Sequence, residues 1–272
     1  MRVLAILATY NEERFVAACL ENLFLQGVDV YLIDNSSTDL TVSIAESYMG
    51  KGLVGIEDLP REGKFSLMPQ LKRKEQLFSE LDADWYIHVD ADEIRLPPAS
   101  HKTLAQALQQ VDAEGYNAVN FFEYTFIPTK EEPDHDHPDF QKTMRWYYPF
   151  LPSYPHRLNA WKRQPGAINL SSSGGHRVQF QGLRMYPENF VMRHYLYLSI
   201  PHALTKYVNR SYDQNEVKTG WHGWRANLAS DRIELPSQLE LRQYVSDDLL
   251  DSSNPRKRHY LADYWAGKQA GR

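Results

Sequence analysis

The chain is poor in cysteine, in long apolar runs and in positive charge. Its 272 residues include a single cysteine, Cys19, so no disulfide can form within the chain. No stretch approaches the roughly 20 apolar residues that span a bilayer. Met1-Arg2 leads straight into a strand-like run rather than into the apolar core of a secretory signal. These absences favour a cytoplasmic protein, and they leave open peripheral contact at the inner face of the cell membrane.

Composition also narrows the choice of partners. The net charge of -5 argues against nonspecific nucleic-acid binding. Aromatic residues are abundant, with 17 Tyr, 6 Trp and 11 Phe, and most follow Asn120. Such side chains hold sugars or flat ligands on some proteins, but packing in the core is their commoner role. Cys19, among apolar neighbours in a predicted helix, is interpreted as a packing residue.

The first half of the chain alternates between strand-like and helix-like patterns. This alternation predicts βαβ units, an α/β fold and a mostly parallel sheet flanked by helices. The predicted strands are Val3–Thr9, Val28–Ile33, Leu53–Ile56, Trp85–Val89 and Ala118–Phe126. The predicted helices are Glu13–Leu25, a segment from Thr38 or Asp39 to Met49, Pro69–Leu81 and Thr103–Val111.

The pattern changes after Phe126. A polar, proline-interrupted loop occupies residues 131–139, and an aromatic-rich stretch containing three prolines follows it. Helical periodicity returns between Ile200 and Tyr212. We expect a single domain over residues 1–272, with an elaboration over residues 126–272 that shapes an acceptor site.

The segment Asp90-Ala91-Asp92-Glu93 follows the apolar run that ends at Val89. Two carboxylates therefore lie two residues apart at the carboxyl end of a predicted central strand, where open α/β sheets bind ligands. Paired hard oxygen ligands suit Mn²⁺ or Mg²⁺, and such a metal commonly binds a diphosphate. The motif indicates an enzyme that acts on a nucleotide-activated substrate.

Four segments in this order resemble the family 2 glycosyltransferases of the GT-A fold, especially those that build bacterial lipopolysaccharide and other surface glycans. They are Ala8-Thr9-Tyr10-Asn11-Glu12-Glu13, Ile33-Asp34-Asn35-Ser36-Ser37-Thr38-Asp39, Asp90-Ala91-Asp92-Glu93 and Met192-Arg193-His194-Tyr195. The resemblance covers residues 1–125 well and residues 155–212 more loosely. It implies a nucleotide-diphosphate sugar as donor, with a UDP-sugar as the default, and a nucleotide-sugar-binding half over residues 1–125.

The resemblance also implies roles for individual residues. Asp92 would ligate the metal, Asp90 would contact the ribose or a metal-bound water, and His194 would complete the metal sphere. The nucleotide would contact the strand-end loops and nearby basic residues, namely Ala8, Thr9, Tyr10, Glu12, Asp34, Lys64 and Arg73. For Lys64 and Arg73, a position on a solvent-exposed helix face without a nucleotide contact is an equally good interpretation. The Asn that usually follows this Arg is Lys74 here.

The catalytic base is less well defined. Family 2 enzymes invert the anomeric centre in a single displacement, so the acceptor hydroxyl must lose a proton. The relatives carry a His-Glu pair after a glycine-containing turn, where this chain has Gly174-Gly175-His176-Arg177. His176 is one candidate base and Glu123 another, with Asp136 and Asp139 as further alternatives. Arg177 would instead bind phosphate or an acidic acceptor.

Two further segments have alternative interpretations. The loop residues His135, Asp136, His137 and Asp139 would form a metal site, an acceptor-side lid or an ordinary loop. The run Arg256-Lys257-Arg258 is a solvated basic patch or a contact for anionic lipid.

Together these features predict a metal-dependent, inverting glycosyltransferase that acts on a glycan or glycolipid hydroxyl. One alternative is a noncatalytic sugar-nucleotide or glycan-binding protein on the same scaffold, which the loss of Glu at Arg177 leaves open. A second alternative is a sugar nucleotidyltransferase. The first loop argues against it, because Ala8-Thr9-Tyr10-Asn11-Glu12 has neither the glycines nor the lysine of a phosphate loop.

Overall fold

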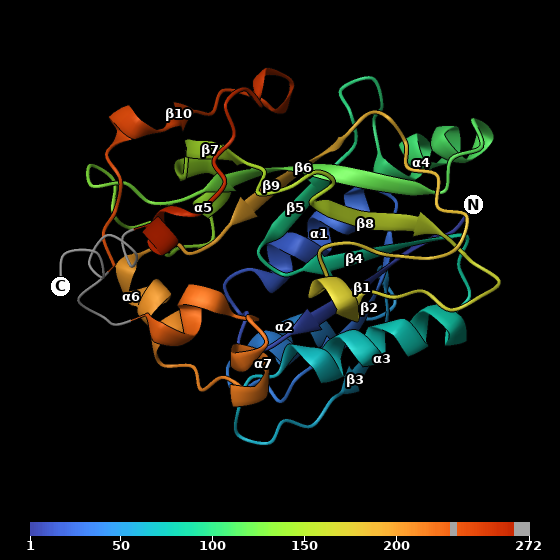
Figure 1. The fold of residues 1–272 in the computed structure, drawn as a ribbon, viewed down its shortest axis with the longest axis horizontal. Helices are drawn as coiled ribbons and strands as arrows, with labels where there is room; N and C mark the ends of the chain where they lie inside the picture. Colours follow the sequence, from blue (N-terminus) through green and yellow to red (C-terminus); the bar gives the residue numbers. More distant parts are fainter. Residues whose placement is uncertain (229–232, 264–272) are drawn as a thin grey trace. The chain divides into compact units, whose positions relative to one another are not determined.

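A computed structural model describes residues 1–228 and 233–263 (Figure 1). The chain divides into two compact units. The first comprises Met1–Arg61, Leu67–Phe122 and Pro155–Arg193. The second comprises Glu62–Ser66, Glu123–Tyr154 and the described residues from His194 onward. The expectation of one functional domain over the whole chain stays a prediction.

Four parallel strands form the centre of the first unit. In spatial order they are β3 (Leu53–Asp58), β2 (Asp29–Asp34), β1 (Val3–Thr9) and β4 (Trp85–Asp90). Strands β1 and β4 are buried along almost their whole length, as expected for parallel strands covered on both faces. The α/β architecture and the parallel sheet predicted from the alternating pattern are thus confirmed.

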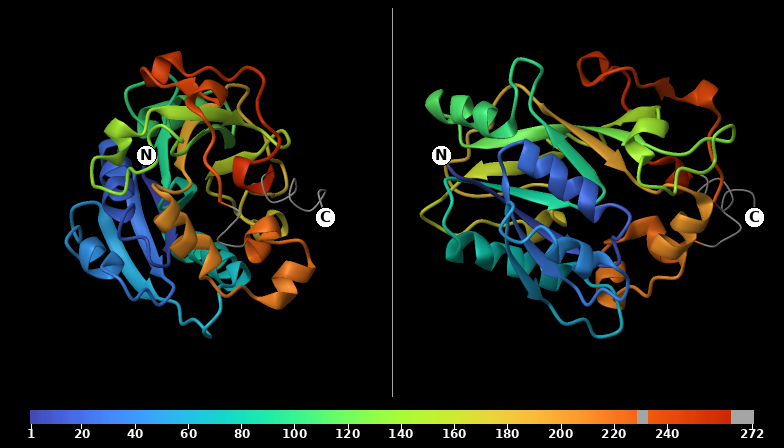
Figure 2. Two further views of the ribbon diagram at one scale, coloured as in Figure 1. Left: turned by 90° about the vertical axis from the view of Figure 1, so that its left-hand side faces the viewer. Right: turned by 180° about the vertical axis from the view of Figure 1, so that it is seen from behind.

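The order in which successive strands are added across the sheet reverses at β1. From β1 the chain steps to β2 and then to β3, whereas β4 returns to the other side of β1. Right-handed crossovers therefore put α1 (Val16–Leu25) and α2 (Thr41–Glu46) on one face, and α3 (Leu67–Glu80) on the opposite face (Figure 2). Ligands of open α/β sheets bind at this kind of reversal, outside the carboxyl ends of the strands.

Further elements complete the first unit. β8 (Arg157–Lys162) pairs antiparallel with β4 and with the first residues of β6 (Ala118–Phe126). β5 (Glu93–Leu96) pairs with β9 (Phe190–Tyr195), and α4 (Leu104–Ala113) has Thr103 as its N-cap. β5, β8 and β9 have no counterpart among the predicted strands.

The second unit is built around aromatic side chains. The last residues of β6 pair with β7 (Trp146–Phe150), and β7 pairs with β10 (Arg242–Gln243). Phe126 stacks on Tyr147 and Tyr195, with ring centroids 5.4 and 5.0 Å apart. Its core also holds Ile127, Tyr148, Phe150, Leu196, Tyr197, Tyr207, Tyr260 and Leu261. Many of the aromatics that follow Asn120 are therefore core residues, the commoner of the two roles considered.

Three short helices, α5 (Phe140–Thr143), α6 (Ile200–Ala203) and α7 (Gln214–Lys218), lie in the second unit. The helical periodicity predicted between Ile200 and Tyr212 is only partly correct, because α6 continues as a π-helical turn that ends at Val208. Residues 211–213 are extended instead. Phe65 donates its backbone N–H to Ser211, and Asp213 donates its own to Phe65.

Candidate active site

The loops after β1 and β2 are fastened to each other at the carboxyl edge of the first unit's sheet. Thr9 and Asp34 are register partners, and the Thr9 hydroxyl donates to the Asp34 carboxylate at 3.1 Å. The backbone N–H of Ser37 donates to the other oxygen of Asp34 at 2.7 Å. Asn11 adopts a left-handed conformation with φ 56° and donates its backbone N–H to the Ser37 hydroxyl. Thr9 and Asp34, both predicted to contact the nucleotide, therefore lie in one hydrogen-bonded framework.

The other predicted nucleotide residues of the first loop lie beside this framework. Ala8 pairs in register with Asp90 across β1 and β4. The Arg61 guanidinium, from the segment after β3, lies 3.6 Å from the centroid of the Tyr10 ring. Glu12 donates its backbone N–H to the Thr41 hydroxyl, and its carbonyl accepts from Phe15 and Val16.

The carboxylates of the Asp-Ala-Asp motif lie at the end of β4 and in the turn that follows it. Half of the Asp90 side chain is exposed, whereas Asp92 is nearly buried. Glu93, also buried, accepts from the Asp90 backbone N–H and from the Arg95 guanidinium. The local desolvation of its carboxyl and the nearby negative charge of Glu93 raise the pKa of Asp90. A bound cation would oppose this effect by favouring the charged carboxylate.

A buried lysine lies beneath the motif. The Lys74 ammonium donates to the backbone carbonyl of Val89 at 3.1 Å and lies 3.1 Å from Nδ1 of His88. Burial lowers the pKa of Lys74 to about 8. Burial, and then the charge of Lys74, lowers the pKa of His88 well below its ordinary value, so the neutral ring accepts from the lysine. The sequence shows Lys74 only as a departure from the family pattern and does not indicate this contact.

The two basic residues predicted to reach the nucleotide form ion pairs. Arg73 makes a two-pronged ion pair with Glu57, at 2.7 and 2.9 Å, and also contacts Glu80 at 2.9 Å. Lys64, in the second unit, lies 2.6 Å from Asp213. To bind the donor, each side chain would have to leave its carboxylate partner or contact the donor as well as that partner. The donor-binding roles of Arg73 and Lys64 therefore stay predictions.

His194 and Glu123 lie together in the second unit. Nδ1 of His194 lies 2.7 Å from a carboxylate oxygen of Glu123, and the Thr125 hydroxyl donates to the same carboxylate at 3.0 Å. The Glu123 side chain is fully buried. A carboxylate that accepts from one nitrogen of histidine fixes the tautomer and directs the other nitrogen toward a metal or a proton. Both residues are site candidates from the sequence, which does not indicate that they pair.

His176 lies in an exposed turn of the first unit. Gly174 and Gly175 precede it with φ 64° and 86°, in the left-handed region that favours glycine. Asn159 donates to the backbone carbonyls of Gly175 and His176 at 2.9 and 3.2 Å, and Asn159 in turn accepts from Arg95. The turn is thereby connected to the polar network beneath the Asp-Ala-Asp motif.

The histidine-rich loop (residues 131–139) and the basic run Arg256-Lys257-Arg258 each form contacts within the second unit. His135 and His137 both lie within hydrogen-bonding distance of the Thr143 hydroxyl. Among residues 1–228 and 233–263, no three His, Cys, Asp or Glu side chains are grouped so as to hold a metal. Arg256 and Arg258 both pair with Asp263. A lid role for the loop and a lipid contact for Arg256-Lys257-Arg258 stay predictions.

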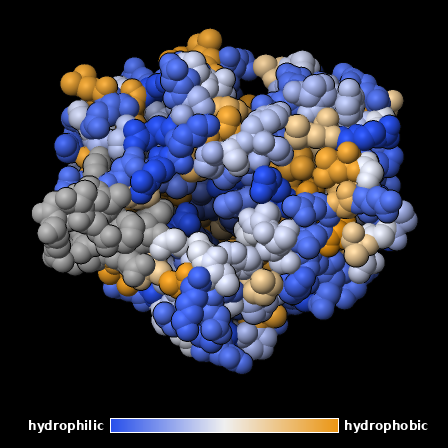
Figure 3. Space-filling view, in the orientation of Figure 1, coloured by the Kyte–Doolittle hydropathy of each residue, from blue (hydrophilic) through white to orange (hydrophobic). Residues whose placement is uncertain are grey.

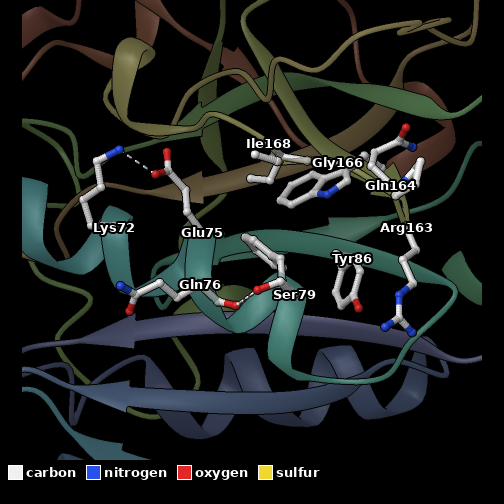
Figure 4. A pocket seen from close by; sticks show the side chains of 13 residues that line it. Lys72, Glu75, Gln76, Ser79, Tyr86, Arg163, Gln164, Gly166 and Ile168 are labelled. Carbon is white, nitrogen blue, oxygen red and sulfur yellow. Dashed lines mark hydrogen bonds and ion pairs between the residues drawn. The ribbon is translucent and has the colours of Figure 1, made fainter.

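A hollow lies between α3 and the segment after β8 (Figure 4). Its volume is about 610 Å³. Phe78, Tyr86 and Trp161 line its interior, while Lys72, Gln76 and Arg163 are among its polar lining residues. Figure 3 shows hydrophobic surface over the end of β8.

No helix among the described residues is long and apolar enough to cross a membrane.

Comparison with known proteins decides the family. The model of glycosyl transferase family 2 matches residues 5–164. This chain belongs to that family. Its α/β fold with a parallel half-sheet agrees with the GT-A fold predicted for the family. The match ends before β9, so it does not cover His176 or His194.

Individual relatives share low sequence identity with this chain. Protein RfbJ of Shigella flexneri is 28% identical over 93 residues, which cover 34% of this chain and 64% of RfbJ. Among solved structures, S. aureus TarS is 14% identical with a TM-score of 0.44, covering 79% of this chain and 41% of that one. The mannosyltransferase PcManGT from Pyrobaculum calidifontis, solved with GDP-Man and Mn²⁺, is 21% identical with a TM-score of 0.44. It covers 71% of this chain and 56% of that one.

Proposed function

We propose that this glycosyltransferase moves a sugar from a nucleotide-diphosphate donor, by default a UDP-sugar, to a hydroxyl of a glycan or glycolipid. One observation carries the proposal. Thr9, Asp34 and Asp90 end three adjacent parallel strands at the point where the strand order reverses, with Asp92 in the turn that follows. This is the position at which open α/β sheets bind nucleotides.

The carboxylates fit a divalent metal, which we propose to be Mn²⁺ or Mg²⁺. Asp92 would be its ligand, with Asp90 as a second or water-mediated one. Two carboxylates suffice because Mg²⁺ typically takes its other ligands from substrate phosphates and water. When bound, the metal supplies a Lewis acid that stabilises negative charge on the departing diphosphate. His194 contacts the Glu123 carboxylate through Nδ1, and a metal-ligating histidine commonly has such a carboxylate partner.

The acceptor side requires a base for the inverting displacement. Glu123 is buried and already accepts two hydrogen bonds, which suits orientation of His194 better than direct contact with the acceptor. His176 is exposed and lies on a turn that Asn159 fixes. We therefore assign removal of the acceptor's proton to His176 in preference to Glu123.

A donor-hydrolysis assay tests the proposal. Purified protein is incubated with a panel of UDP-, GDP-, CDP- and ADP-sugars, with and without Mn²⁺, and the released nucleoside diphosphate is measured. We expect Asp92→Asn to lower the rate about a hundredfold or more, since metal stabilisation of charge contributes several kcal/mol. The matched variant is Asp112→Asn. It removes a carboxylate on α4 that pairs with Lys162, and it should leave the rate unchanged.

The alternatives give different outcomes. Nucleotide-sugar binding without release of a nucleoside diphosphate, even with acceptor glycans present, would favour the noncatalytic binding protein. Release of pyrophosphate from a nucleoside triphosphate would show a nucleotidyltransferase. Absence of binding to every nucleotide sugar would overturn the proposal.

A further inference from the structure

Asn159 is a fully buried residue of β8 whose side-chain amide connects two segments of the first unit. Its Oδ1 accepts from Nη2 of Arg95 at 3.1 Å, and its Nδ2 donates to the backbone carbonyls of Gly175 and His176 at 2.9 and 3.2 Å. A guanidinium can only donate and a carbonyl can only accept, so these partners define the orientation of the amide. A side-chain amide offers an acceptor on one side and two N–H donors on the other. Asn159 is therefore matched to all three partners at once.

Arg95 joins this amide to the Asp-Ala-Asp motif. The same Nη2 donates to the Glu93 carboxylate at 2.5 Å, and Glu93 accepts from the backbone N–H of Asp90 at 3.2 Å. The side chains of Arg95 and Glu93 are both buried. Desolvation offsets most of the attraction within a buried ion pair, so such a pair typically contributes little net stability compared with apolar packing. A chain of buried polar contacts thus runs from the proposed metal carboxylates to the turn that carries His176, and stability alone does not account for it.

The turn that carries His176 is also closed by its own backbone. The N–H of Gly175 donates to the carbonyl of Leu170 at 3.1 Å, which shapes the turn. The bonds from Asn159 act differently, because they hold the carbonyls of Gly175 and His176 toward β8. The His156 ring packs against the His176 ring, with centroids 5.0 Å apart. Loss of the Asn159 amide would therefore displace His176 from β8 while the turn keeps its own hydrogen bond.

We propose that Asn159, oriented by Arg95, is a positioning residue that holds His176 where its imidazole meets the acceptor hydroxyl. The inference rests on the proposed function, with His176 as the base. A misplacement of about 1 Å at a reacting group costs up to roughly a hundredfold in rate. The loss of Asn159 should therefore lower kcat. The KM for the donor and the Mn²⁺ requirement should be unchanged, because Arg95 retains its bond to Glu93.

A double-mutant cycle on the full chain tests this role. It measures release of nucleoside diphosphate from the nucleotide sugar that wild type hydrolyses fastest, with Mn²⁺ present and water in place of the acceptor hydroxyl. We expect His176→Ala to lower kcat about a hundredfold or more, as loss of a general base does, and Asn159→Ala to lower it about 10- to 100-fold. The double variant should have the kcat of His176→Ala alone, because residues that act as a unit are not additive.

Asn117→Ala is the matched control in the same unit. The Asn117 amide also connects a turn to a strand region, since it donates to the carbonyl of Gly182 and accepts from the N–H of Arg184. Its loss removes the same kind of contact at a turn that does not carry His176. The kcat of Asn117→Ala should therefore equal that of wild type.

The outcomes separate this inference from the proposed function. Wild type that releases no nucleoside diphosphate contradicts the proposed function itself, whereas an unchanged kcat in His176→Ala contradicts only the choice of base and the positioning role that depends on it. Losses that multiply in the double variant, or a raised donor KM in Asn159→Ala, would show that Asn159 acts independently of His176 and would overturn the inference. If thermal unfolding shows that Asn159→Ala is not folded, Asn159→Asp takes its place in the cycle. It keeps the size of the side chain and an acceptor for Arg95, but an ionised carboxylate cannot donate to the two carbonyls, so the same pattern is expected.

Discussion

Replacement of Gly175 by alanine should destabilise the protein because two costs coincide at this position. Gly175 has φ 86°, and for an L-residue the left-handed region costs roughly 1–2 kcal/mol. An added Cβ would also lie 2.9 Å from Nε2 of His88 and 3.1 Å from Cδ2 of Leu71. The His88 ring cannot easily retreat, since it is buried and its other nitrogen contacts Lys74. Overpacking of this kind typically adds about 1–3 kcal/mol.

Gly182→Ala is the matched control. Gly182 has φ 79°, but nothing lies within 4 Å of an added Cβ. Both substitutions reduce the entropy of the unfolded chain equally, so that effect cancels in the comparison. We therefore expect Gly175→Ala to lower the free energy of unfolding by about 1–3 kcal/mol more than Gly182→Ala. Urea denaturation monitored by tryptophan fluorescence measures both variants. Equal losses would refute the reasoning that His88 holds the turn before His176 in place.

Two further variants test the buried groups near the site. Lys74 has a lowered pKa when folded, so the unfolded chain binds more protons between about pH 8 and 10.5. The wild-type free energy of unfolding should accordingly rise with pH relative to Lys74→Met across that window, by at most roughly 1.4 kcal/mol per pH unit. Parallel pH profiles would contradict a buried ammonium at this position. Glu123→Gln should lower activity about 10- to 100-fold and raise the Mn²⁺ concentration needed for half-maximal rate, because His194 loses its charged partner. Asp248→Asn, an exposed substitution in the same unit, should change neither. An unaltered Mn²⁺ dependence in Glu123→Gln would contradict a role for His194 at the metal.

The sequence predicts the parallel half of the sheet well because its signals are local. β1 occupies the predicted residues, β4 extends the predicted Trp85–Val89 by one residue, and outside the parallel half β6 also occupies its predicted residues. The start of α1 is less well predicted: the helix begins at Val16 rather than Glu13, because the loop residues before it bond to the neighbouring loop instead. α2 is likewise shorter than expected, ending at Glu46.

The pairings within the site depend on contacts between residues far apart in the chain. Glu123 and His194 are separated by 71 positions, and no spacing rule relates them. The two-pronged bond from Arg73 to Glu57 depends on how α3 packs beside β3, which periodicity alone does not define. β5 has only four residues, and β8 and β9 carry polar side chains such as Arg157, Asn159 and His194 within the strand, so none of them shows the continuous apolar run that identifies β1.

The hydrogen bonds between the loops after β1 and β2 bear on how a nucleotide would bind. Asn11 adopts a left-handed conformation, and hydrogen bonds with Ser37 and Thr38 hold it there. A side chain that is ordered by folding loses no further conformational freedom when a ligand arrives. Because hydrogen bonds within the protein hold this loop, nucleotide binding at this edge should change the loop's protection from hydrogen exchange only slightly.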